Sequence, residues 1–504
     1  MNNLSIKRLG RNVTYNALSF VAAFVVNFAL LPFIISHVGK EIYGIYTLVM
    51  IITGYLFLCD FGMTAGVIKY VAEYLGNKDY DKVNDVISAS FSVLLVIGIL
   101  SALILVILSY YFDMLFNVQP DNKIIVKQLF WVAAVASLIV WPGKVFESAL
   151  QGFQGYGWLA INNIGGAICT GLAAYIIFSH HMTITLYLAI LYLIIIIRYL
   201  IAFTIIYKKL MAKKIKIFYY SKEMMRKLFG FGTYLFLGSL FSIIILQFDN
   251  ILIGAFLSVS SVAVYAVVYN LQHVFRVLNG LLGGPLLPFN AEMEGKSQYE
   301  EQRTMVYKGT KYMSLTFVSM VIIAIFFAGP FITKWMGEGF NESILPAQIL
   351  LSFWIFNGTL EVGMGMIVAK GIVKAPFKIT ALNAICNLGL SLILIRYYGI
   401  IGVVLGTTIP MILINFPSCL YLILKHTNIT LKAFFDHAIK NNLKIYFIAG
   451  ILSMITQIIY PPPNLIIILL EMTGVYILAL LIGYRWVLSL GEREEISRIV
   501  RACI

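Results

Sequence analysis

The chain has 504 residues, of which 60% are apolar and only 12% are Asp, Glu, Lys or Arg. Soluble domains carry about 25% charged residues, so this composition excludes a soluble globular protein. The formal net charge of +14 does not indicate nucleic-acid binding, because the basic residues lie in short segments between apolar runs. That distribution is the one expected of cytoplasmic loops in a membrane protein.

Apolar runs of roughly 20 residues, long enough to cross a bilayer as α-helices, recur along the chain. Only helices and closed barrels satisfy every backbone polar group in lipid. We therefore predict an all-α polytopic membrane protein with about fourteen transmembrane helices. Their expected ranges are 14–36, 45–66, 86–109, 129–147, 161–179, 186–207, 233–257, 262–283, 313–332, 348–369, 379–395, 402–424, 445–459 and 465–488.

The positions of the positive charges predict the orientation in the membrane. The basic segment 1–12 leads into an apolar run that is too long for a signal-peptide core, so we expect a retained first helix. An even number of crossings then places both termini on the cytoplasmic side. In this orientation the outer loops contain few of the 37 Lys and Arg residues, namely Lys40, Lys123, Lys127, Lys334 and Arg396.

A weak internal repeat suggests how the helices are grouped. One constant shift places Tyr15 on Tyr234 and Tyr46 on Tyr265. Because six crossings restore the starting side, helices 1–6 and 7–12 would be parallel repeats. The expected divisions are a six-helix lobe over 1–210, a second over 211–430, and helices 13 and 14 with a cytoplasmic tail over 431–504.

Ionisable residues inside the predicted helices are the best pointers to function, because a charge at mid-bilayer costs about 2.5–3.5 kcal/mol on insertion scales. Five such residues are taken as candidates, namely Asp60, Arg198, Asp249, Arg276 and Glu361. The structural alternative is that the acids and arginines only neutralise one another.

The predicted helix 262–283 carries a polar stripe. At 100° per residue, Gln272, His273, Arg276 and Asn279 fall within an arc of about 120°, which indicates a water-filled interior rather than lipid. Other polar residues inside predicted helices are Asn250 beside Asp249, and the pairs Asn357 with Glu361 and Asn383 with Asn387. The members of each pair are four residues apart and are expected on one helical face. For the asparagines, hydrogen bonding between helices is the alternative.

Several other motifs carry less weight. The pairs Lys69–Glu73 and Lys144–Glu147 are typical of solvated helix ends, although Lys69 is kept as a candidate substrate-binding residue. His180 has no carboxylate or Cys neighbours at ligand spacing, so no metal site is expected. No phosphate-binding GxxxxGK[ST] motif occurs, and no cofactor is expected.

Three segments resemble a known group of transporters. They are ALLPFIISHVGKEIYGIYTLV, DFGMTAGVIKYVAEYLGNKDYDKV and QFDNILIGAFLSVSSVAVYAVVY. They resemble the polysaccharide-export branch, which includes O-antigen flippases, of the multidrug/oligosaccharidyl-lipid/polysaccharide exporter superfamily. That superfamily also holds MATE drug antiporters and lipid II flippases.

The resemblance implies two six-helix lobes around a central cavity, with helices 13 and 14 forming a groove for a lipid tail. It also implies that an undecaprenyl-diphosphate-linked oligosaccharide is moved across the bacterial cytoplasmic membrane. An arginine fork suits a diphosphate because it binds two oxygens at once. The candidate substrate-binding residues are Arg198, Arg276, His273, Gln272, Asn279 and Lys69.

A buried carboxylate can titrate near neutral pH, so H⁺ or Na⁺ is a candidate coupling ion. The candidate ion-coupling or charge-pairing residues are Asp60, Asp249, Glu361, Asn250 and Asn357. A MATE-type antiporter of organic cations is the first alternative function. A membrane-embedded glycan polymerase or ligase is the second, and it is disfavoured because every predicted outer loop is short. We therefore expect a transporter and not an enzyme.

Overall fold

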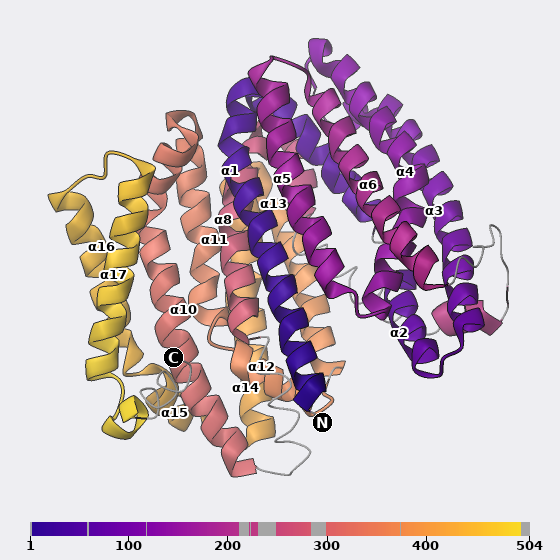
Figure 1. Ribbon diagram of the computed structural model, residues 1–504. Coiled ribbons are helices and arrows are strands. Elements are labelled where there is room, and N and C mark those ends of the chain that lie inside the picture. The colour runs from indigo at the N-terminus through magenta and orange to yellow at the C-terminus, as the bar shows by residue number, and fades with distance from the viewer. Residues whose placement is uncertain are drawn as a thin grey trace. The chain divides into compact units, whose positions relative to one another are not determined.

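The computed structural model describes residues 3–57, 60–116, 118–210, 221, 223–229, 248–283, 299–372 and 374–494. Within these ranges the regular structure is helical, and no strand occurs (Figure 1). Nine of the described helices are long and apolar enough to cross a membrane, and a bent pair brings the number to ten. The chain is therefore a multi-pass helical membrane protein. Its packing divides it into unit 1, residues 1–243 and 254–263, and unit 2, residues 244–253 and 264–504.

The main helices of unit 1 are α1 (Asn3–Leu56), α2 (Met63–Gly76), α3 (Tyr80–Leu115), α4 (Lys123–Gly152), α5 (Tyr156–Ser179) and α6 (Ile184–Lys209). The first two predicted helices lie largely within α1, α2 lies mostly beyond the predicted end of the second, and α3 to α6 correspond to the next four. Side-chain caps start two of them, because Asp79 accepts a hydrogen bond from the Lys82 backbone N–H and Thr183 accepts one from that of Leu186. The helix α4 packs along α3 and α6, and α1 packs along α5.

The helix α1 contains a break at Gly39. This residue has φ 80° and ψ 166°, a conformation that glycine adopts without steric cost. The break lies between the predicted helices 14–36 and 45–66. The second of these was expected to continue to residue 66, but α1 ends at Leu56.

Unit 2 contains most of α8 (Val259–Gly283) and all the helices that follow. The later helices are α10 (Tyr299–Met336), α11 (Ile344–Asn357), α12 (Glu361–Ala369), α13 (Lys374–Pro410), α14 (Phe416–Thr427), α15 (Leu431–Phe434), α16 (Asn442–Ile459) and α17 (Leu465–Trp486). In Figure 1, α16 and α17 lie beside α10, and both pack against it. The predicted helix 233–257 lies mostly outside the described residues.

Three helices of unit 2 differ from their predicted bounds. The helix α10 begins at Tyr299, so residues 299–312 continue a helix where a cytoplasmic loop was expected. The predicted helix 348–369 is broken into α11 and α12, which are bent by 53°. The helix α13 joins the predicted helices 379–395 and 402–424 through Gly399, which has φ 56° and ψ −130°.

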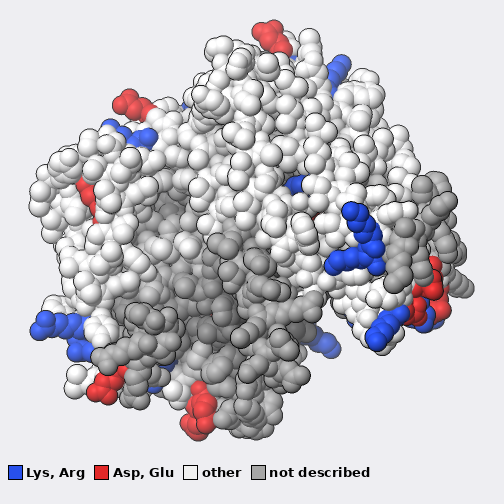
Figure 2. All heavy atoms as spheres, in the orientation of Figure 1, with Lys and Arg blue, Asp and Glu red and all other residues white. Residues whose placement is uncertain are grey.

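Charged side chains are sparse on the surface. On the face drawn in Figure 2, Lys, Arg, Asp and Glu gather mainly near helix ends, and the described surface between them is mostly uncharged. Many large apolar side chains are exposed along the described helices, such as Leu103, Ile107, Ile466 and Leu470. Exposed apolar surface along whole helices is what contact with lipid requires.

Candidate functional site

In unit 2, α8 directs three of its polar residues to one cavity. Gln272, Arg276 and Asn279 line a cavity of about 460 Å³, as the stripe in the sequence predicts. His273, expected in the same stripe, instead stacks on Tyr269 with ring centroids 5.9 Å apart. Polar residues from other parts of unit 2 also line the cavity, among them Asp249, Asn357, Glu361 and Thr407.

Arg276 is the cationic group of this cavity. One guanidinium N–H donates to the Tyr269 hydroxyl at 3.4 Å, and the guanidinium carbon lies 6.0 Å from the centroid of the same ring. None of the acidic side chains in the described ranges lies within ion-pair distance of it, although Asp249 and Glu361 line the same cavity. The charge of Arg276 is therefore available to an anionic ligand.

Glu361 lies at the start of α12, where the helix dipole stabilises a carboxylate. It accepts a hydrogen bond of 2.9 Å from the Asn279 side chain and so joins α12 to α8. The expectation that Asn357 and Glu361 share one helical face is wrong, because the chain bends between them. Asn357 donates instead to the backbone carbonyls of Phe353 and Met411.

Asp249 is almost completely buried, at 1% exposure, beside Asn250 at 3%. Its Oδ2 accepts hydrogen bonds of 2.9 Å from the hydroxyls of Tyr265 and Thr407. The Thr407 hydroxyl in turn accepts a 2.7 Å bond from the Asn387 amide. The other carboxylate oxygen, Oδ1, is buried and has no hydrogen-bond partner in the described part of the chain. This site thus offers one uncommitted anionic oxygen.

The buried asparagines of α13 are part of the same region. Asn383 and Asn387 are each 1% exposed. Asn387 donates to Thr407, as a helix-joining asparagine would, whereas Asn383 leaves its side-chain oxygen without a partner in the described residues. Carboxylate, hydroxyl and amide oxygens together are ligands that hard cations such as Na⁺ and Ca²⁺ take.

In unit 1, Arg198 of α6 lies at a second cavity, of about 600 Å³, lined also by Asn163 and Gly166 of α5. The Arg198 guanidinium donates to the Asn163 side-chain oxygen and lies 3.5 Å from Glu147 of α4. A Cβ atom on Gly166 would lie 2.9 Å from Arg198 Cδ, so the glycine makes room for this side chain. Arg198 is therefore partly neutralised, whereas Arg276 is not.

The prediction that Asp60 lies within a helix is wrong. It lies in the turn between α1 and α2, where its carboxylate accepts hydrogen bonds from the Gly62 N–H at 2.8 Å and from the Thr64 hydroxyl. Lys144 of α4 lies 3.6 Å from it. Asp60 is thus a paired carboxylate at a helix start.

The interpretation of Lys144 and Glu147 as a solvated helix end is also wrong. Each pairs with a residue far away in the sequence, Lys144 with Asp60 and Glu147 with Arg198. A spacing of three residues places them on one side of α4, but which groups lie opposite depends on the fold. Lys69 of α2 is exposed, with its ammonium 4.8 Å from the Tyr70 ring centroid, and it does not line the Arg198 cavity.

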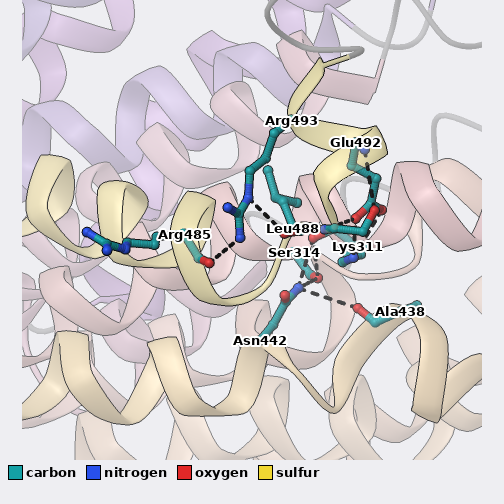
Figure 3. Close-up of polar contacts among 9 residues, drawn as sticks. Lys311, Ser314, Ala438, Asn442, Arg485, Leu488, Glu492 and Arg493 are labelled. Atoms are coloured by element: carbon teal, nitrogen blue, oxygen red, sulfur yellow. Dashed lines mark hydrogen bonds and ion pairs between the residues drawn. The ribbon is translucent and has the colours of Figure 1, made fainter.

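Three further ionisable residues in unit 2 were missed in the sequence. Lys311 of α10 and Glu492 lie 2.8 Å apart, with side chains only 12% and 11% exposed (Figure 3). Glu471 lies within the apolar helix α17. Glu471 could have been found, because it is an acidic residue inside a predicted transmembrane helix, as Glu361 is.

Comparisons with known proteins agree with this fold. Residues 9–294 match the model of a family described as polysaccharide biosynthesis protein. A protein of Shigella flexneri named as an O-antigen transporter is 21% identical over 80% of this chain and 95% of its own length. An uncharacterised membrane protein of Methanocaldococcus jannaschii is 20% identical over 79% of this chain and 80% of its own length.

Two solved structures share the fold. The lipid II flippase MurJ, in an inward closed conformation, has a TM-score of 0.67 at 17% identity, covering 94% of this chain and 99% of MurJ. A MATE-family multidrug resistance transporter, in an inward-facing conformation, has a TM-score of 0.67 at 15% identity, covering 83% and 98%. Both are transporters of one superfamily, and the sequence resemblance to that superfamily is confirmed.

Proposed function

Because this chain belongs to the polysaccharide biosynthesis protein family, we propose that it is a flippase for a lipid-linked oligosaccharide. The substrate is a unit of O-antigen, capsule or another surface polysaccharide, carried on undecaprenyl diphosphate across the bacterial cytoplasmic membrane. The similarity to an O-antigen transporter and to a lipid II flippase supports the proposal. Transport is by alternating access, and no cofactor takes part.

The observation that carries the proposal is the cavity containing Arg276. The head group of such a substrate cannot enter hydrocarbon, and its tail cannot leave it. A polar cavity with a cation is therefore required, and Arg276 supplies a planar fork that matches phosphate oxygens. Gln272 and Asn279 add amide groups suited to sugar hydroxyls.

We extend the proposal to the topology. Fourteen helices cross the membrane with both termini in the cytoplasm, as the positive charges predict. Residues 1–210 and 211–430 form the two lobes, and 431–504 supply the last helix pair, whose apolar surface accompanies the lipid tail. This arrangement supports movement of the head group while the tail stays in the bilayer.

For energy coupling we propose Asp249 as the cation site. Its Oδ1 atom is buried without a partner among the described residues. The Thr407 hydroxyl bonded to Oδ2 is held in place by a hydrogen bond from the Asn387 amide nitrogen. A proton or a sodium ion would neutralise this carboxylate. Asp60, by contrast, already has Lys144 beside it.

The test of the function is the substitution Arg276→Ala. Charge-assisted hydrogen bonds contribute about 1.5–3 kcal/mol, so loss of the head-group contact should lower export about 10- to 100-fold. Export is measured as surface glycan in cells that depend on this gene, with the protein level determined by immunoblot. The matched control is Arg396→Ala, which removes an exposed arginine of the same unit and should export normally.

Two outcomes would contradict the proposal. Normal surface glycan in the Arg276→Ala cells would remove this residue from the substrate site. Resistance to organic-cation drugs that depends on the wild-type protein, without any effect on surface glycan, would favour the MATE-type alternative instead.

A further inference from the structure

The helix α17 carries one acidic residue, Glu471, six residues after its first. Both carboxyl oxygens are covered by protein atoms, and neither has a hydrogen-bond partner within the described ranges. The side chain therefore does not reach out to a membrane surface. It is a carboxyl group of the last helix pair, and it does not line the cavity that contains Arg276.

The position of Glu471 on α17 explains why its oxygens are covered. The buried residues of this helix are Ile468, Val475, Ala479 and Gly483. Glu471 follows Ile468 by three residues and precedes Val475 by four, which places it beside this buried stripe. At Gly483 an added Cβ would lie 3.0 Å from Leu315, so α17 packs closely on α10.

The helix pair is fixed to α10 at one end, as Figure 3 shows. At the start of α16, the Asn442 amide donates to the Lys311 carbonyl at 2.8 Å and to the Ser314 hydroxyl at 2.7 Å. After the end of α17, Glu492 pairs with the Lys311 ammonium. These bonds oppose rotation of the pair about its own axis, so the buried stripe of α17, with Glu471 beside it, keeps its orientation.

No charge compensates Glu471 on the helices packed against α17. From Met313 to Thr333, α10 has no ionisable residue, and its nearest cation beyond is Lys334. From Phe447 to Ile459, α16 has none, and Lys444 and Tyr446 lie at its other end. On α17 itself, Tyr476, Tyr484 and Arg485 follow Glu471. None of these is bonded to Glu471.

The polar residues at the outer end of α16 are already committed. Ser453 and Thr456 donate to backbone carbonyls of their own helix. The Gln457 amide donates to the carbonyls of Phe326 and Ser453. Glu471 lies twelve residues before Gly483, or about 18 Å along the helix, which brings it to the level of Phe326 on α10. An ionised carboxylate at this level would thus lack both a donor and a cation.

We propose that Glu471 is a proton-binding site, separate from the substrate cavity and from Asp249. While α17 packs on α10, the carboxyl group is neutral and carries the proton, because an uncompensated charge in hydrocarbon is costly. Water that enters between α17 and α10 stabilises the carboxylate, and the proton then leaves. Packing of α17 against α10 is in this way linked to the binding of one proton by Glu471.

Infrared difference spectroscopy tests this directly. The full chain is reconstituted in lipid nanodiscs at pH 7, and the spectrum of Glu471→Gln is subtracted from that of the wild type. We expect the C=O stretch of one protonated carboxylic acid, without carboxylate bands. The control is Glu492→Gln, whose difference spectrum should show carboxylate bands, because Glu492 is ion-paired.

Carboxylate bands for Glu471 at pH 7 would overturn the proposal. Glu471→Asp guards against a folding defect in the glutamine variant, because it should retain a protonated band at a shifted frequency.

Thermal unfolding gives a second readout. If Glu471 is protonated, the Glu471→Gln variant, which has a neutral side chain of similar shape, should unfold within a few degrees of the wild type. If Glu471 is instead ionised and paired in the wild type, the Glu471→Gln variant should be much less stable than the wild type. Both measurements are independent of glycan export, so they stand or fall separately from the proposed function.

Discussion

Arg276 and Arg198 carry the same charge, but their neighbours leave them with different capacities to bind an anionic ligand. Arg198 is shared between Asn163 and Glu147, whereas Arg276 donates a hydrogen bond to Tyr269 and has no ion pair with an acidic side chain among the described residues. A cation that is already paired must first break that pair before it binds phosphate, which lowers its net contribution. For that reason Arg276, rather than Arg198, is the principal head-group ligand in our proposal.

Asp249 is the second residue whose surroundings define its role. We expect Asp249→Asn to keep the fold, because the amide oxygen still accepts hydrogen bonds from Tyr265 and Thr407. It removes the charge that would bind a cation, so transport should lose its dependence on an imposed H⁺ or Na⁺ gradient. Uptake of a fluorescent lipid-linked glycan into inside-out vesicles measures this, with and without the gradient. A loss of about tenfold in the stimulation by the gradient corresponds to about 1.4 kcal/mol of coupling free energy.

The control for Asp249 is Ser391→Ala. Ser391 is fully buried in the same helix as Asn387 but donates to the Val403 carbonyl rather than to the Asp249 network. Its removal should leave the gradient dependence unchanged. If Asp249→Asn remained coupled like the wild type, the cation site would have to lie elsewhere.

At the scale of elements, α13 illustrates how glycine permits two helical segments to meet. After the break at Gly399, the chain returns so that Gly406 faces Ser391. A Cβ on Gly406 would lie 2.2 Å from Ser391 Oγ and 2.6 Å from its backbone nitrogen. Backbone atoms cannot move aside as a flexible side chain can, so this contact requires glycine.

The prediction at this scale compares two glycines of α13. Gly406→Ala should destabilise unit 2 by about 1–3 kcal/mol, because the segments are forced apart. Gly389→Ala is the control, since no atom lies within 4 Å of its Cβ position. That substitution should be neutral or stabilising by up to about 1 kcal/mol through helix propensity. Thermal unfolding in detergent distinguishes them, and equal melting temperatures would contradict the close contact.

At the scale of the whole molecule, the last two helices are attached to α10 by a nearly buried ion pair. Burial acts to raise the pKa of Glu492, but the hydrogen bonds from Lys311 and from the Ser489 backbone outweigh it and hold the pKa below its ordinary value. Because the folded-state pKa is lowered, this contribution to stability is present above the unfolded-state pKa of about 4.3 and is lost as the pH falls through the folded-state value.

We therefore predict a pH-dependent effect of Glu492→Gln. At pH 7 the substitution should lower stability by about 1–3 kcal/mol, because a charge-assisted hydrogen bond is lost. The difference from the wild type should begin to shrink as the pH falls to about 4.3, where the carboxylate of the unfolded chain takes up a proton, and should disappear below the lower folded-state pKa. Melting curves of both proteins between pH 7 and the acid range measure it. A difference that is the same at every pH would show that Glu492 acts without its charge.

The sequence by itself determined the class of protein and most of the helices. Long apolar runs are a local property, and their length alone indicates a membrane span. The breaks at Gly39 and Gly399 also lie where separate helices were predicted. The stripe on 262–283 placed Gln272, Arg276 and Asn279 on one side correctly, because helical periodicity is fixed by backbone geometry.

Only the tertiary structure decided which polar groups meet. Lys144 pairs with Asp60, and Glu147 pairs with Arg198, although the partners are far apart in the sequence. The spacing of residues along one helix cannot predict such contacts. Glu471 differs from these residues only in that its neighbouring helices carry no partner for it. Whether a buried charge is paired, bound to a ligand or protonated depends on what lies within a few ångströms, and the packing of distant helices determines that.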